Sequence, residues 1–102
     1  EGPGDYQMPK VTAELITAVV SRPQTGFFVN VDGLSEEAVL RVEVLDALER
    51  SVSGLGVVIR QSGFQVPLDL GDVKKLPEKM RLRVLFEGAK RSEIRLSAIY
   101  VK

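Results

Sequence analysis

LRVEVLD, residues 40–46, alternates apolar with charged side chains. Residues 80–86, MRLRVLF, and residues 94–101, IRLSAIYV, repeat the same two-residue period. Because successive side chains of an extended chain point to opposite faces, each run predicts a strand with one buried face. Several such strands, separated by Gly, Pro and Ser, are typical of an antiparallel sandwich. The sequence therefore predicts an all-β fold, an antiparallel β-sandwich of jelly-roll-like form.

About seven strands are expected, at residues 11–21, 27–32, 40–48, 55–60, 64–70, 80–86 and 92–101. The first run has a short helix as its alternative. Pro67 has no amide hydrogen to donate, which places its strand at a sheet edge or a bulge. Residues 71–79 show no clear period, so we expect them to cross from one sheet to the other, with Leu76 anchored in the core.

The predicted core follows from which residues share the inward face of each strand. It consists of Leu15, Val29, Val31, Leu40, Val42, Val44, Val57, Ile59, Val66, Leu68, Leu82, Val84, Phe86, Leu96 and Ala98. Phe64 is placed on a core face as well. Phe27 and Phe28 are adjacent and must point to opposite sides of a regular strand. We expect Phe28 to point outward, because Phe27 is spaced by two residues from Val29, which is itself two residues from Val31, so these three share one face.

Length and composition indicate one domain at residues 11–102, preceded by a flexible lead-in or linker remnant at residues 1–10. Its 14 basic and 14 acidic residues give no net charge, which argues against a nucleic-acid partner. No apolar stretch approaches the roughly 20 residues that cross a bilayer, so no membrane insertion is expected. The chain begins at Glu1 without the features of a signal peptide, which favours a processed chain or a domain of a longer protein.

The chain has no His, Cys or Trp. This composition excludes an imidazole base, a Ser-His-Asp triad, a thiolate nucleophile and an ordinary zinc site. Pairs of acids occur at Glu36-Glu37 and at Asp69 with Asp72, in predicted loops or outward positions. We therefore expect a protein that is not an enzyme and has no cofactor. Asp69, Asp72 and Asp32 are weak candidates for holding a hard cation, with turn formation as the preferred explanation.

Outward-pointing rings and guanidinium groups provide the candidate binding residues. Aromatic rings stack on the apolar faces of sugar rings, and Arg binds hydroxyl or acidic groups. The candidate ligand-binding residues are Tyr100, Phe28, Arg41, Arg83 and Arg95. If their strands are neighbours, Arg41, Arg81, Arg83 and Arg95 form a guanidinium ladder opposite Glu43 and Glu93. Cross-strand ion pairing is the preferred interpretation of this ladder, and binding of an acidic glycan or phosphate is the alternative.

Three segments occur in a familiar order: Arg22-Pro23 followed by Gly26–Asn30, then Leu40–Ala47, then Arg81–Phe86. In this order the chain resembles the β-sandwich modules appended to bacterial sialidase-like and other glycoside hydrolases. The similarity covers about residues 22–100. It implies an ancillary, non-catalytic domain that packs against or extends a carbohydrate-active enzyme. Residues 64–70 have no Trp where that family tends to place one, so no sugar contact is carried over.

Together these features predict a non-catalytic accessory or interaction module of a larger protein. A secreted or cell-surface location is favoured, and the parent protein could be carbohydrate-active. The alternative is a carbohydrate-binding module that uses Tyr100, Phe28 and the nearby Arg side chains. Expected partners are a neighbouring domain of the same or another protein, a glycan, or a second copy of the chain paired through an edge strand.

Overall fold

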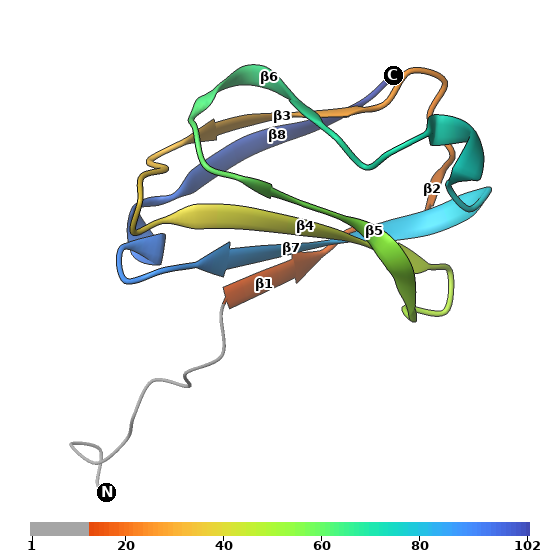
Figure 1. Ribbon diagram of the computed structural model, residues 1–102, viewed down its shortest axis with the longest axis horizontal. Helices are drawn as coiled ribbons and strands as arrows, with labels where there is room; N and C mark the ends of the chain where they lie inside the picture. Colours follow the sequence, from red (N-terminus) through yellow and green to blue (C-terminus); the bar gives the residue numbers. More distant parts are fainter. Residues whose placement is uncertain (1–12) are drawn as a thin grey trace, which may run out of the picture.

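The computed structural model describes residues 13–102, apart from the side chains of Ala13 and Ser53. The expected lead-in at residues 1–10, with residues 11 and 12 of the first predicted strand, lies outside this part. Two antiparallel sheets face each other (Figure 1). Sheet A has the order β1 (Ala13–Ile16), β7 (Lys79–Glu87), β4 (Val39–Asp46), β5 (Ser51–Ile59), and β2 (Val20–Ser21) also pairs with β7. Sheet B has the order β6 (Gly63–Leu68), β3 (Phe27–Asp32), β8 (Arg95–Val101). The predicted antiparallel sandwich is confirmed.

The chain alternates between the two sheets along most of its course (Figure 1). It crosses between them after β2, β3, β5, β6 and β7, and β4 and β5 form a hairpin within sheet A. The connection from β6 to β7 contains the short 3-10 helix η2 (Val73–Lys75) and carries buried Leu76. A second short helix, η3 (Arg91–Glu93), joins β7 to β8. The expected crossing at residues 71–79 and the anchoring role of Leu76 are thus confirmed.

The core lies between the sheets and follows the alternation seen in the sequence. Nine of the predicted core residues are buried: Val29, Val31, Leu40, Val42, Val44, Ile59, Leu68, Leu82 and Val84. Phe86, Val57, Val66 and Leu96 are half-buried and pack against them. The core also contains residues that are not in the predicted core list, namely Phe27, Ala38, Leu70, Met80 and Ile94. Phe27 is only 1 % exposed, which confirms that Phe28 belongs to the outward side.

The first predicted strand is wrong in two respects. It is broken into β1 and β2, which raises the strand count to eight. At the break the Thr17 hydroxyl accepts a hydrogen bond from the Leu82 amide (2.9 Å). Leu15 is 45 % exposed rather than buried. It faces the core side, opposite Val84, but β1 is an edge of the wider sheet, and the three strands of sheet B leave that edge uncovered.

Two β-bulges in sheet B overturn two further core predictions. On β6, Gly63 pairs with Val31 and Val66 pairs with Val29, so β6 has one residue more than β3 here. The extra residue reverses the side-chain alternation, and Phe64 is 88 % exposed instead of buried. On β8, the pairing with β3 skips Ser97, which leaves Ala98 opposite Asn30 on the outer face rather than in the core. Pro67 lies in β6, which is an edge strand as predicted.

Asp46 closes the β4–β5 hairpin, where β4 ends two residues earlier than expected. Its carboxylate accepts hydrogen bonds from the amides of Leu48 (2.8 Å) and Arg50 (3.0 Å) and from Arg50 Nε (2.8 Å). The Arg50 amide is the largest cause that lowers the pKa of Asp46 below 3.8, and partial desolvation opposes it. The charged carboxylate is therefore favoured in the folded state.

Asp46→Asn is expected to lower the melting temperature at pH 7 and to have much less effect near pH 2. A lowered folded-state pKa adds stability above the unfolded value near 3.8. That stability is lost as the pH falls through the lower folded value. Thermal unfolding of both proteins at the two pH values measures the difference. Asp69→Asn is the control, because Asp69 accepts one amide, that of Gly71 (3.2 Å). An equal loss at both pH values would contradict the assignment.

Candidate functional site

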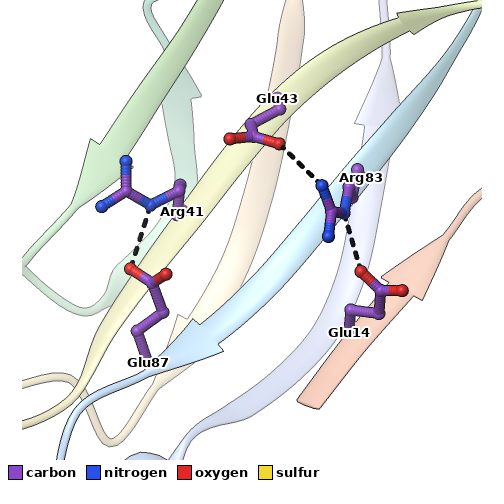
Figure 2. Close-up of polar contacts among 5 residues, drawn as sticks. All are labelled: Glu14, Arg41, Glu43, Arg83 and Glu87. Carbon is purple, nitrogen blue, oxygen red and sulfur yellow. Dashed lines mark hydrogen bonds and ion pairs between the residues drawn. The ribbon is translucent and has the colours of Figure 1, made fainter. Parts of the chain in front are cut away.

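The outer face of sheet A is covered by ion pairs between its own strands (Figure 2). Arg41 Nε lies 3.0 Å from Glu87 Oε1, and Arg83 bridges Glu14 (2.7 Å) and Glu43 (3.4 Å). The hydrogen bond with Glu14, followed by the charges of Glu14 and Glu43, raises the pKa of Arg83 from its usual value. Cross-strand pairing, the preferred interpretation of Arg41 and Arg83, is therefore confirmed for both residues.

Two leucines lie on this same face among the charged side chains. Leu45 is opposite Arg81, and Leu85 is opposite Arg41, so each pair shares the outer side of sheet A. Both leucines are buried, although neither belongs to the core cluster between the sheets. Long Arg side chains can cover apolar surface with their methylene groups while their charged ends stay in water. The outer face of sheet A thus carries paired charges around two leucines that its own side chains bury.

The predicted guanidinium ladder is wrong for Arg95. Arg41, Arg81 and Arg83 are on β4 and β7 of sheet A, whereas Arg95 is on β8 of sheet B. Glu93 lies in the helix η3 and does not face the ladder. The physical reason is that the chain crosses from sheet A to sheet B after β7. The strands β7 and β8 have similar alternating sequences but therefore belong to different sheets.

The outer face of sheet B places two predicted ligand residues side by side. Phe28 on β3 is directly opposite Tyr100 on β8. The Lys102 ammonium lies 5.1 Å from the centre of the Phe28 ring and 5.9 Å from that of Tyr100, within the range of cation–π attraction. Asn30 donates a hydrogen bond to the Tyr100 hydroxyl (2.9 Å). These residues form a fixed aromatic and cationic cluster at one end of the face.

A hollow of about 430 Å³ occupies the other end of this face. It is lined by Asn30, Val31, Asp32, Ser62, Gly63, Phe64, Arg95 and Ser97. Arg95 therefore shares a face with Phe28 and Tyr100, whereas Arg41 and Arg83 lie on the opposite outer surface of the sandwich. We call the outer side of sheet B the aromatic face, defined by Phe28, Asn30, Asp32, Phe64, Arg95 and Tyr100.

Asn30 connects the two ends of the aromatic face. Its Oδ1 accepts a hydrogen bond from the amide of Gln65 (2.7 Å), while its Nδ2 donates to Tyr100. Gln65 has a φ of 48°, a left-handed conformation that a side-chain hydrogen bond helps to hold. Both bulges of sheet B lie at the level of Asn30, and bulges frequently re-aim side chains beside binding sites.

Phe64 and Asn30 are the residues of this site that the sequence pattern did not identify. Phe64 has the parity of a core residue, and only the bulge turns it outward. Gly63 at the start of the strand is the one sequence signal of that bulge, because glycine inside a strand often marks an irregularity. Asn30 occupies an ordinary outward position, and its role depends on partners 35 and 70 residues away.

The three acids considered as cation ligands bind backbone amides in turns. Asp32 accepts from Gly33 (2.8 Å), Asp69 from Gly71 (3.2 Å) and Asp72 from Lys74 (2.9 Å). Within residues 13–102 no three acids gather in a group that could hold a metal ion. Nor does this part of the chain contain a helix long and apolar enough to cross a membrane.

A second hollow, of about 480 Å³, lies along β4 and β5 on sheet A. It forms where β5 departs from β4, since Gly56 pairs with Glu43 but Ser51 pairs with Leu45. Its two charged residues, Arg41 and Glu43, are already engaged in the ion pairs of sheet A. The aromatic face is therefore the better candidate for a binding surface.

No family model, no curated protein and no solved structure matches this chain.

Proposed function

We propose that this chain is a non-catalytic accessory or interaction module of a larger, secreted or cell-surface protein, as the resemblance to modules of glycoside hydrolases implies. The aromatic face is its contact surface. The observation that carries the proposal is the difference between the two outer faces. The outer face of sheet A pairs five of its charged residues and buries Leu45 and Leu85 among them. Sheet B instead presents aromatic rings that no strand of the described chain covers, exposed at Phe64 and half-buried at Phe28 and Tyr100.

Exposed aromatic rings with a few charged neighbours are common at sites of protein recognition. Phe28 and Tyr100 lie on paired strands, the Asn30 hydrogen bond holds Tyr100, and Lys102 lies over Phe28, so little conformational entropy is lost when a partner covers them. Lys102 is also fixed, because its backbone exchanges hydrogen bonds with Gly26 (3.1 and 3.0 Å). A rigid, partly apolar surface of this kind suits docking against a neighbouring domain.

Chemical footprinting tests this proposal. Hydroxyl-radical labelling of the chain alone and within the longer protein measures which side chains become covered. We expect Phe28 and Tyr100 to lose most of their reactivity in the longer protein. Leu48, which is 73 % exposed at the sheet A hairpin, is the internal control and stays reactive. Unchanged labelling of both rings would refute docking through the aromatic face.

Carbohydrate binding is the second candidate, favoured by the hollow beside Phe64. A ring next to carboxylate, guanidinium and hydroxyl groups is the usual composition of a sugar site. If the chain binds carbohydrate, Phe28, Tyr100 and Arg95 remain candidate contacts with the sugar. Arg41 and Arg83 do not, because both are paired on sheet A. Saturable binding on a glycan array, lost in Phe28→Ala or Tyr100→Ala, would favour this candidate over docking alone.

A further inference from the structure

We propose that the hollow beside Phe64 binds one neutral pyranose ring, either a free sugar or the end of a glycan. Asp32 and Arg95 bind its hydroxyl groups, and Phe64 stacks on its apolar side. This inference rests on the proposed function in one respect, since it uses the aromatic face as the binding surface. It adds a site, a ligand class and a role for each residue.

The Phe64 ring is exposed at the border of the hollow. A phenyl side chain that is 88 % exposed in a folded domain leaves a large apolar area in water. The β6 bulge fixes it there, because the extra residue between Gly63 and Val66 turns the ring away from the core. The ring borders a hollow rather than a flat surface. A pyranose that enters the hollow can lay its C–H face on the ring and remove both apolar surfaces from water.

Arg95 and Asp32 both have hydrogen-bonding atoms without a partner in the described chain. Arg95 Nη1 is held by the carbonyls of Ser92 (3.1 Å) and Ile94 (3.4 Å), while its Nε and Nη2 have no partner in the described chain. Asp32 Oδ1 accepts from Gly33, and Oδ2 likewise has no partner there. The hollow thus offers donors beside an acceptor. Vicinal hydroxyls, each able to donate and to accept, match this arrangement.

The charge of the hollow selects a neutral sugar. Asp32 lies directly opposite Arg95 in the β3–β8 pairing, yet the two form no ion pair within 4.0 Å. They are the only ionisable residues among those that line the hollow. Because Asp32 and Arg95 face each other, the carboxylate of an acidic sugar that pairs with Arg95 also lies near Asp32, and the ammonium of an amino sugar that pairs with Asp32 also lies near Arg95. Like-charge contact of this kind discriminates against both classes.

Neighbouring contacts hold these groups in place before a ligand arrives. Asn30 fixes the Gln65 backbone beside Phe64 (2.7 Å), and the Ser62 hydroxyl accepts from the Leu34 amide (3.0 Å). Gly33 packs directly against Glu93 of η3, the helix that leads into Arg95. A site assembled in this way loses little entropy on binding.

NMR titration of the whole chain with methyl pyranosides tests the inference. The panel comprises methyl glucoside, galactoside and mannoside, together with methyl glucuronide and methyl glucosaminide as charged probes. At least one neutral glycoside is expected to shift the amides of Asp32, Gly63 and Arg95 saturably. We expect the charged analogue of that sugar to bind at least about tenfold more weakly, the equivalent of about 1.4 kcal/mol.

Variants assign the roles. Phe64→Ala abolishes binding and Phe64→Tyr keeps it, while Asp32→Asn and Arg95→Gln each weaken it by about tenfold or more. Leu48→Ala removes an exposed apolar side chain from the far hairpin and leaves binding unchanged. Because Phe64 is exposed, its alanine variant is expected to melt at close to the parent temperature, so loss of binding is not loss of folding.

Three results would overturn the inference: no saturable shift with any neutral pyranoside, charged sugars that bind as tightly, or shifts that survive in Phe64→Ala. The footprinting experiment separates this failure from failure of the proposed function. Rings covered in the longer protein without any sugar binding would retain the docking function and reject the sugar site. Sugar binding without covered rings would retain the sugar site and reject the docking function.

Discussion

Phe27→Ala is expected to lower the free energy of unfolding by about 3–5 kcal/mol, whereas Phe28→Ala lowers it by about 1 kcal/mol or less. Phe27 is 1 % exposed and lies among the core residues of both sheets. Truncation there leaves a cavity that close-packed neighbours fill only in part. Phe28 points to the outer side of sheet B. Its truncation removes the cation–π contact with Lys102 and the ring opposite Tyr100, but leaves no cavity in the core.

Urea unfolding of the two variants and the parent measures this contrast. The slope of the unfolding free energy against urea should be similar in all three, because a single truncation barely alters the surface exposed on unfolding. The midpoint should fall sharply for Phe27→Ala alone. A Phe28→Ala variant as unstable as Phe27→Ala would mean that the two rings share the core. The aromatic face would then lose one of its three rings.

The neighbouring phenylalanines also show what strand periodicity can predict. The alternation through Phe27, Val29 and Val31 is uninterrupted on β3, so parity alone assigns each residue to its correct face. The same reasoning holds along β4 and β7, whose burial alternates over most of their length. Local patterns suffice here because each strand is regular and covered by the opposite sheet.

Parity fails for Phe64 and Ala98 because one extra residue shifts every later position by one face. It fails for Leu15 for another reason, since the burial of an edge strand depends on the width of the opposite sheet. The pairing partners of a strand also cannot be read from its own sequence. Arg83 and Arg95 have similar sequence neighbours but lie on different sheets. The candidate site was therefore predicted in part, with Phe28, Tyr100 and Arg95 correctly placed outward and the hollow beside Phe64 missed.

Gly33→Ala is expected to destabilise the domain far more than Gly71→Ala, although both glycines have a left-handed backbone. Their φ angles are 80° and 87°. A side chain in this conformation costs about 1–3 kcal/mol. A Cβ at Gly71 would meet nothing within 4 Å, whereas a Cβ at Gly33 would overlap the Glu93 carbonyl oxygen. We expect Gly71→Ala to cost about 1–2 kcal/mol, and Gly33→Ala to exceed it by about 2 kcal/mol or more.

Asparagine at the same two positions separates backbone strain from steric overlap. Asn adopts left-handed conformations more readily than Ala, so Gly71→Asn should recover part of the stability lost in Gly71→Ala. Gly33→Asn should recover little, because its Cβ meets the same carbonyl oxygen. Chemical denaturation of the four variants measures both differences. Equal costs at the two sites would show that η3 can move away from Gly33 without penalty.

The Gly33 result also bears on the sugar site. Gly33 follows Asp32, and Glu93 lies two residues before Arg95, so their close contact sets how these two groups face each other across the hollow. If Gly33→Asn folds with η3 displaced, the binding of the neutral pyranoside should weaken although neither contact residue has changed. Gly71→Asn, at a turn outside the hollow, should bind as the parent does. Unaltered binding in a displaced Gly33→Asn variant would mean that Phe64 alone holds the sugar.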